Sequence, residues 1–403
     1  MISSQLDKII QAKKSDIADW FQAKEQLRAP LFYSSVDIRN SGEKIAPVDT
    51  NIFPAGFNNL SRAAQDKASE EVSKYLKKLD AAAQKIILVT EFHTRNSFYL
   101  SNVNALKKII NSAGYEVLCA SFAEDFNQAL DLTDSNEQAL TIYPLSKKSD
   151  KLHIAEQNFT ADLVIVNNDL TSGRPALFEN LAQPVIPPLG MGWYRRRKYQ
   201  HFSSYNKLAS QFAKEFGLAE FLISTELGFC KKVNFKERKG LECIAIEAEK
   251  TLSRLRSKYQ EHNIKAEPYV YIKANNGTYG MGIMHVKDAE EVFSLNKKHR
   301  NKMHKIKSNV ATAEILIQEG IATIDQYQNS PAEIFVYLIN NNPLGSILRI
   351  NQEKDAFTNL NSSGAIFKAA DDLSEFKNKL DSYQLIARLA ALAASFEEYD
   401  ETV

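Results

Sequence analysis

The sequence predicts a mixed α/β protein of two or three domains, and three patterns lead to this prediction. The chain opens with a helix and two strands within residues 2–53. A strand, a helix and a second strand follow from residue 85, which is typical of a parallel sheet. Helices and strands then alternate from about residue 201 onward. A chain of 403 residues is long enough for each part to bury a core.

The composition argues against several classes of partner. The 50 basic and 49 acidic residues give a formal net charge of +1, so no overall field favours nucleic acid or an anionic membrane. The longest apolar runs are too short to cross a bilayer. Cys119, Cys230 and Cys243 show no paired spacing, and the N-terminal residues contain no apolar signal core. We therefore expect a cytoplasmic protein without a disulfide framework, with no nucleic-acid or membrane partner, while a homo-oligomer stays open.

Residues 1–65 form the first predicted domain. Apolar side chains at helical spacing predict a helix over 2–28. The stretch 30–53 predicts two strands around a turn at 40–43. A helix followed by a β-hairpin is therefore expected here.

Residues 84–200 form the second predicted domain, which we expect to be Rossmann-like. The strand KIILVTE at 85–91, a helix over about 97–112 and the strand EVLCASF predict a βαβ unit. DLVIVNNDL at 162–170 is an apolar run with a polar end, as expected of a buried parallel strand that opens on a ligand crevice. The segment 185–193, VIPPLGMGW, reads as a linker.

Residues 201–403 form the third predicted domain, again α/β. Helices are expected over about 204–216 and 246–260, and strands at 266–274, 282–287, 312–318, 332–340 and 344–351. Between the first two strands, Lys273 precedes a loop with three glycines. Glycines let backbone amides approach an anion, and the lysine adds a positive charge. The loop is a candidate phosphate cover, and a plain tight turn is the alternative.

The next strand extends this pattern, because ATAEILIQEGIAT ends in a polar break suited to reading an adenine edge. A lysine strand, a glycine hairpin and an acidic hinge in this order resemble the ATP-grasp fold. The resemblance implies that Lys273 and the loop hold the ATP phosphates and that the break holds adenine. Lys207 resembles the first ATP lysine of glutathione synthetase, although a surface helix lysine is the alternative. The implied ATP-binding residues are Lys207, Lys273, Asn275, Gly277, Thr278, Tyr279, Gly280, Gly282, Gln318, Glu319 and Ile321.

The segment SILRINQEKDAFTNLNSSG resembles a strand and loop of glutathione synthetase, in which an arginine precedes Asn-Leu by ten residues. Arg349 and Asn359 hold this spacing. The resemblance implies a catalytic role, because a guanidinium and an amide can stabilise charge on an acyl phosphate. The sequence also departs from the pattern: Phe357 replaces a second arginine, and the strand AEIFVYLIN lacks the arginine expected after Glu333. An edge-strand arginine beside a polar turn is the alternative.

An enzyme of this fold also needs magnesium ligands on its final strand, and nothing after Asn361 supplies them. Asp49 and Asn51 lie two residues apart, so both would lie on one face of the second N-terminal strand, with Asp37 on the neighbouring strand. We infer that the ATP-grasp domain is circularly permuted and that residues 1–65 complete its metal site. Mn²⁺ is an alternative to Mg²⁺, and an ordinary exposed turn at 49–51 is the alternative to a metal site.

Five segments together resemble the proteobacterial-type glutamate-cysteine ligase family: VDTNIFPAGFNNL, RNSFYLSNVNALKKII, IPPLGMGWYRRRKYQHF, IKANNGTYGMGI and TNLNSSG. The resemblance implies the first step of glutathione biosynthesis, in which ATP and L-glutamate give a γ-glutamyl phosphate and L-cysteine displaces phosphate. Candidate amino-acid or anion contacts are Arg95, Asn96, Asn58, Arg195, Arg196 and Arg197. For Arg95 and Asn96 a solvated loop with a helix cap is the alternative.

Three other functions stay open from the sequence. The first is another ATP-grasp carboxylate-amine ligase with a different amino-acid pair. The second is a catalytically silent nucleotide-binding regulator, favoured by the departures at Phe357 and after Glu333. The third is a nucleic-acid-binding module, supported only by the basic run at 195–198.

Overall fold

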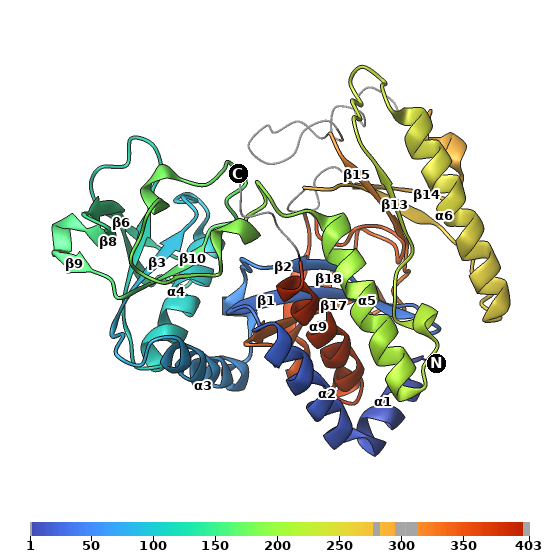
Figure 1. Cartoon of the computed structure of the whole chain (residues 1–403), viewed down its shortest axis with the longest axis horizontal. Helices are drawn as coiled ribbons and strands as arrows, with labels where there is room; N and C mark the ends of the chain where they lie inside the picture. Colours follow the sequence, from blue (N-terminus) through green and yellow to red (C-terminus); the bar gives the residue numbers. More distant parts are fainter. Residues whose placement is uncertain (1, 277–282, 295–302, 304–312, 398–403) are drawn as a thin grey trace.

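The computed structural model describes residues 2–276, 283–294, 303 and 313–397. This part of the chain contains four sheets, and the three larger ones organise the fold (Figure 1). A parallel sheet lies on the left of that view, a central antiparallel sheet lies in the middle, and a small antiparallel sheet covered by one long helix lies at the upper right. None of the described helices is long and apolar enough to cross a membrane.

The central sheet joins the two ends of the chain. Its strand order is β19-β18-β17-β1-β2, and the short β16 pairs with β17. The strands are β1 (Tyr33–Asn40), β2 (Ile45–Asn51), β16 (Gln326–Tyr327), β17 (Ser330–Ile339), β18 (Asn342–Ile350) and β19 (Ile366–Ala369). The N-terminal hairpin thus continues a sheet made by residues from the other end of the chain, with β1 antiparallel to β17.

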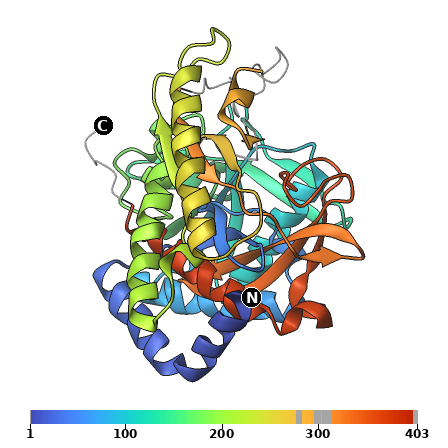
Figure 2. The same cartoon turned by 90° about the vertical axis from the view of Figure 1, so that its right-hand side faces the viewer.

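Helices cover one face of the central sheet. They are α1 (Ile2–Ala12), α2 (Lys14–Leu27), α5 (Lys198–Phe216) and α9 (Leu380–Ser395), with the short α8 (Ser374–Lys377) nearby. Figure 2 shows these helices from the side. Val36 and Ile38 of β1 and Val336 of β17 pack against them in one core. Because side chains alternate along a strand, Asp37 and Arg39 lie on the opposite face, where Phe335 and Tyr337 of β17 share a core with α3 and α4.

The parallel sheet has the order β11-β10-β3-β4-β6-β5, with only the edge strand β5 antiparallel to its neighbour. Its strands are β3 (Lys85–Thr90), β4 (Glu116–Ser121), β5 (Leu130–Thr133), β6 (Ala139–Pro144), β10 (Leu163–Asn167) and β11 (Val185–Ile186). Helices α3 (Arg62–Leu79) and α4 (Ser97–Ser112) pack on it. A three-stranded sheet completes this region, with β7 (Ser146–Lys148), β8 (Lys151–Ile154) and β9 (Phe159–Thr160).

The small antiparallel sheet has the order β12-β15-β13-β14. Its strands are β12 (Leu227–Cys230), β13 (Val270–Ala274), β14 (Ile283–Val286) and β15 (Ile315–Glu319), and α6 (Leu241–Glu261) packs on one face. Lys273 and Tyr271 on β13 alternate with Val270 and Ile272, which contact α6. These two polar side chains therefore point away from α6.

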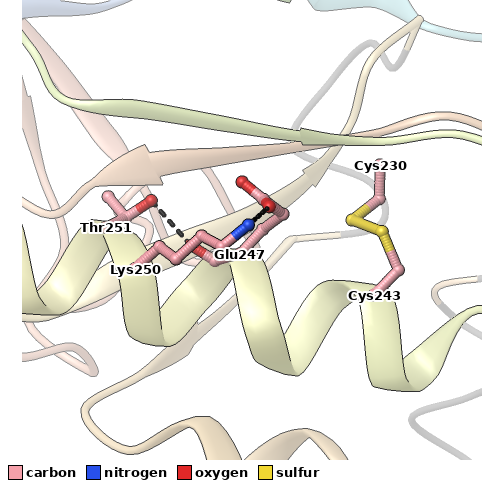
Figure 3. Close-up of a disulfide and its surroundings, with 5 residues drawn as sticks. All are labelled: Cys230, Cys243, Glu247, Lys250 and Thr251. Carbon is pink, nitrogen blue, oxygen red and sulfur yellow. Dashed lines mark hydrogen bonds and ion pairs between the residues drawn. A yellow bond between two sulfur atoms is a disulfide. The ribbon is translucent and has the colours of Figure 1, made fainter.

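The structure corrects three expectations. Cys230 at the end of β12 and Cys243 in the first turn of α6 form a disulfide (Figure 3), so the absence of a paired-cysteine motif did not exclude a bond. The expected linker contains β11, which pairs with β10 and so belongs to the parallel sheet. The first helix is broken at Lys13 into α1 and α2, and both helices contribute side chains to one core.

Candidate active site

A row of alternating, buried charges crosses the face of the central sheet that lies opposite α5 and α9. Arg39 Nε donates to Glu333 Oε2 at 2.8 Å, and Arg349 Nη1 donates to Asp37 Oδ2 at 3.0 Å. Arg349 also donates to Glu333, which therefore lies between two guanidinium groups. Burial opposes ionisation of Glu333, but the two arginines outweigh it and hold its pKa below the usual value. Burial raises the pKa of Asp37 in spite of Arg349.

Two lysines approach the edge of this row. Asp49 lies opposite Asp37 in the register of β2 and β1, and its carboxylate forms an ion pair with Lys198 at the start of α5. Burial opposes the ionisation of Asp49, but Lys198 and Lys273 outweigh it and keep its pKa low. Lys273 Nζ donates to Val48 O at 3.0 Å and to Gln318 Oε1 at 2.8 Å.

Lys273 is a buried cation whose hydrogen-bond acceptors are uncharged. Its side chain is only 6 % exposed. Burial is the largest effect on its ammonium group and lowers its pKa to about 7, against the attraction of Asp49. A polyphosphate in contact with this group would supply the negative charge that the two acceptors lack.

Two cavities meet at Asp37 and Asp49. The smaller cavity, of about 50 Å³, lies between the central sheet and β13, and Arg39, Lys198 and Lys273 also line it. The larger cavity, of about 1170 Å³, extends from the charged row to the parallel sheet. Its walls include the loop after β2, the start of α4 and the loop 361–365. The three sheets therefore meet at one junction.

The structure brings the three predicted metal ligands to this junction. Asp37, Asp49 and Asn51 all line the larger cavity, the two aspartates from paired positions on β1 and β2. Their carboxylate and amide oxygens are of the kind that Mg²⁺ accepts. No group of three or more His, Cys, Asp or Glu side chains with metal-binding geometry occurs among the described residues. A cation held here would thus rely on the two aspartates and the asparagine.

The two predicted catalytic residues line different walls of the junction. Arg349 faces the larger cavity and is 6 % exposed. Asn359 lines the smaller cavity, where its Oδ1 accepts from Asn361 N at 3.0 Å. The loop 351–365 therefore connects both cavities to the end of β18.

The predicted ATP residues are divided by the structure. Lys273 lies at the junction, and Gln318 accepts its hydrogen bond. Glu319 is fully buried and pairs with Lys44 at 2.8 Å, while the carbonyl of Ile321 accepts from Arg39 at 3.4 Å. Gly277, Thr278, Tyr279, Gly280 and Gly282 lie outside the described residues.

Only some of the other predicted residues line the junction. Lys207 is exposed on α5 and lines a separate groove with Leu27 and Gln211. Asn275 is buried, and its side chain bonds to Tyr199 N and Glu314. The remaining contact candidates are divided as follows: Asn58 and Asn96 line the larger cavity, Arg95 is exposed and lines neither cavity, and Arg195 and Arg197 line another groove of about 1750 Å³.

Arg196 corrects the interpretation of the basic run as one anion site. It is 1 % exposed, and its guanidinium binds Glu397 at 2.9 Å and the carbonyl of Thr50 at 2.5 Å. Glu397 Oε1 also accepts from His201 Nδ1 at 2.7 Å. Arg196 therefore ties the C-terminal end of α9 to β2 inside the fold.

Sequence reasoning missed two cations that the structure places at the site. Arg39 binds Tyr271 Oη at 2.9 Å and the carbonyl of Thr358 at 2.6 Å, so it links β1 to β13 and to the loop carrying Asn359. The available signal was its position two residues after Asp37, on the same face of one strand. Lys198 ends the basic run, and nothing in that run distinguishes it from its neighbours.

The arrangement combines cations with carboxylates in a way that suits phosphoryl transfer. Lys198, Lys273 and Arg349 offer positive charge to phosphate oxygens, and Asp37 and Asp49 offer oxygens to a divalent cation. The larger cavity adjoins these groups and has room for small polar molecules. This junction can therefore support the transfer of a phosphoryl group from a phosphate donor to a small substrate.

Comparison with known proteins points to one family. The model of the GshA glutamate-cysteine ligase family matches residues 7–398. A crystal structure described as "Putative gamma-glutamylcysteine synthetase", from Methylobacillus flagellatus KT, superposes with a TM-score of 0.89. It is 34 % identical, and the match covers 98 % of this chain and 95 % of that one.

Two more distant structures are also similar. A glutathione synthetase-like effector from Globodera pallida gives a TM-score of 0.42 at 10 % identity, covering 91 % of this chain and 84 % of that one. D-alanyl-alanine synthetase A from Vibrio cholerae gives 0.36 at 10 % identity, covering 75 % and 80 %. None of the curated protein sequences matches the chain.

Proposed function

The chain belongs to the glutamate-cysteine ligase family, and we propose that the junction around Asp37, Asp49 and Lys273 is its catalytic centre. The activity of the chain is the ATP-dependent joining of L-glutamate and L-cysteine. The observation that carries the site proposal is the pair of aspartates on β1 and β2, which line both cavities and face the cations Lys198, Lys273 and Arg349.

The cations account for the handling of phosphate. In the proposed reaction the γ-carboxylate of glutamate attacks the terminal phosphorus of ATP, and ADP leaves. Lys273 holds the polyphosphate, and Arg349 stabilises the charge on the transferred phosphoryl group. The amine of cysteine then attacks the acyl carbon, loses a proton, and releases phosphate to give γ-glutamylcysteine.

Magnesium is the metal that we propose for Asp37, Asp49 and Asn51, with manganese as an alternative. Their oxygens fit a hard cation, and the low pKa of Asp49 keeps its carboxylate ionised. A bound cation would neutralise charge on the phosphates. Asp49 now pairs with Lys198, so this lysine would turn to the phosphates when Asp49 binds the metal.

The arrangement of the hairpin supports the proposal of a circularly permuted ATP-grasp fold. β1 carries Asp37 and pairs with β17, the strand that contains Glu333. β17 pairs in turn with β18, which contains Arg349. The parallel sheet would then be the Rossmann-like domain that precedes the ATP-grasp domain. The cytoplasmic location that we also propose would expose the pair Cys230 and Cys243 to a reducing environment.

The variant Asp49→Asn tests the site directly. It keeps the shape of the side chain but removes the charge that would bind the metal, so turnover should fall at least about 1000-fold. ATP binding without a divalent cation should persist, because a negative charge near the phosphates is lost. The measurement is ADP release with MgATP and L-glutamate, with and without L-cysteine, together with mass detection of γ-glutamylcysteine.

A matched control is Asp66→Asn, which makes the same chemical change on the exposed face of α3. It should leave turnover unchanged. Full activity of Asp49→Asn would refute the metal role, and loss of ATP binding would show that this variant is misfolded or that Asp49 acts elsewhere. Thermal unfolding of both variants separates these two causes.

A further inference from the structure

The wall of the larger cavity that faces the charged row is built by α4. This helix begins at Ser97, directly after the loop that follows β3, and Asn96, Phe98, Tyr99 and Asn102 line the cavity. A helix of 16 residues presents partial positive charge at its N-terminus, which favours an anion. The loop also lies beyond the carboxyl end of a parallel strand, where α/β proteins commonly bind ligands.

Asn102 supplies an independent observation in this wall. Its side chain is 2 % exposed, and its Oδ1 accepts from Gly56 N at 2.7 Å and from Phe57 N at 3.0 Å. Two donors fix this atom as the oxygen, so the other terminal atom is the NH₂ nitrogen. That nitrogen, Nδ2, is buried and has no acceptor among the described residues.

A buried amide donor without an acceptor lowers the stability of the fold, unless a bound ligand supplies the acceptor. The loop that fixes Asn102 is itself specified: Gly56 has a φ of 101°, and a Cβ there would lie 2.6 Å from the hydroxyl of Tyr337. Arg349 also lines this cavity, and its Nε is a second buried donor that has no acceptor among the described residues. The cavity therefore has one unsatisfied donor near the charged row and another at α4.

We propose that Asn102 Nδ2 and the N-terminus of α4 bind the α-carboxylate of an amino-acid substrate. The proposal rests on the function above and adds a binding residue to it. A donor at α4 would hold the unreactive end of the substrate, while Arg349 faces the reacting end. Asp169 lines the same cavity and offers charge of the sign that an α-ammonium requires. Glutamate and cysteine both carry an α-carboxylate, so the test must distinguish them.

The variant Asn102→Asp is suited to this test. The introduced carboxylate keeps an oxygen for Gly56 N and Phe57 N, but it replaces the amide donor with a group that repels a carboxylate. The KM of one amino acid should rise roughly 10- to 100-fold, because a hydrogen bond to a charged group is lost. The KM of the other amino acid and that of ATP should change less than about threefold.

The pH dependence distinguishes this role from a structural one. As pH falls, the introduced carboxyl becomes protonated and can donate again, so the KM defect should shrink. If the variant raises the KM of glutamate but not that of isoglutamine, the α-amide of glutamate, the site binds glutamate. If the variant raises the KM of cysteine but not that of cysteamine, which has no carboxylate, the site binds cysteine. The control Asn111→Asp makes the same change at an exposed position of α4 and should alter neither KM.

The outcomes are decisive in both directions. Unchanged KM values, or equal rises for both amino acids that do not shrink at low pH, would overturn the proposal. Titration calorimetry with L-glutamate and L-cysteine measures the same selectivity without turnover. If the unmodified protein makes no γ-glutamylcysteine, the proposed function fails, whereas the calorimetric comparison still decides the role of Asn102. Thermal unfolding shows whether Asn102→Asp has lost the fold.

Discussion

Proton uptake on ATP binding tests the role of Lys273. Burial lowers the pKa of this lysine to about 7, and its present acceptors are a carbonyl and an amide oxygen. A polyanion in contact with the ammonium favours the charged form and must raise this pKa on binding. By linkage, ATP then binds more tightly to the protonated protein, and its affinity falls as pH rises above about 7.

The size of the effect follows from the pKa. At pH 8, a group with a pKa of about 7 is protonated in roughly one molecule in ten. If bound ATP raises the pKa by about three units, nearly every bound molecule is protonated, so binding takes up about 0.9 proton. The terminal phosphate of ATP is already ionised at this pH and contributes little to the exchange.

Titration calorimetry at pH 8 in two buffers with different ionisation enthalpies measures this uptake. The variant Lys273→Met removes the titrating group and should bind ATP more weakly, with no uptake. An uptake below about 0.2 proton in the unmodified protein would refute the assignment of Lys273 to the phosphates. The same conclusion would follow if Lys273→Met retained the full uptake.

Two further substitutions test the residues that sequence reasoning missed or misassigned. Arg39→Lys keeps the charge but cannot bind Glu333, Tyr271 and the carbonyl of Thr358 together, so kcat/KM should fall roughly 10- to 100-fold. Steady-state kinetics measure kcat/KM for this variant and for the exposed control Arg62→Lys. If the two variants were equally active, Arg39 would have no positioning role. Glu397→Gln leaves Arg196 buried without its counter-charge and should lower the free energy of unfolding by about 3–5 kcal/mol. Urea denaturation tests this against Glu249→Gln at an exposed ion pair, and equal stabilities would show that Arg196 does not depend on Glu397.

The elements that sequence reasoning predicted share strong local patterns. β1 alternates apolar and polar residues from Val36 to Arg39, and β10 is an apolar run that ends in Asn167, so both were recognisable without tertiary information. The sequence also placed Asp37 on the strand next to that of Asp49, and the structure adds that the two residues are paired in register. What the local pattern could not give is the partner of β1, because β17 lies at the other end of the chain.

The missed or misassigned residues depend on tertiary context. The run 195–198 contains four cations of equal local character, yet Arg196 is buried against Glu397 and Lys198 reaches Asp49. Asn102 is one of several polar residues in α4, and only the approach of Gly56 reveals what its side chain does. Cys230 and Cys243 meet because β12 lies against α6, a contact that their spacing does not encode.

The pairing of β1 with β17 also has a consequence for synthesis on the ribosome. Val36 pairs with Val336, so the first hairpin emerges long before its neighbour in the sheet exists. At about 5–20 residues per second, translation of the roughly 300 intervening residues takes about 15–60 s. During that time an apolar strand edge is unpaired and open to association or chaperone binding. A nascent chain arrested before β17 has been made therefore contains both aspartates but no catalytic centre.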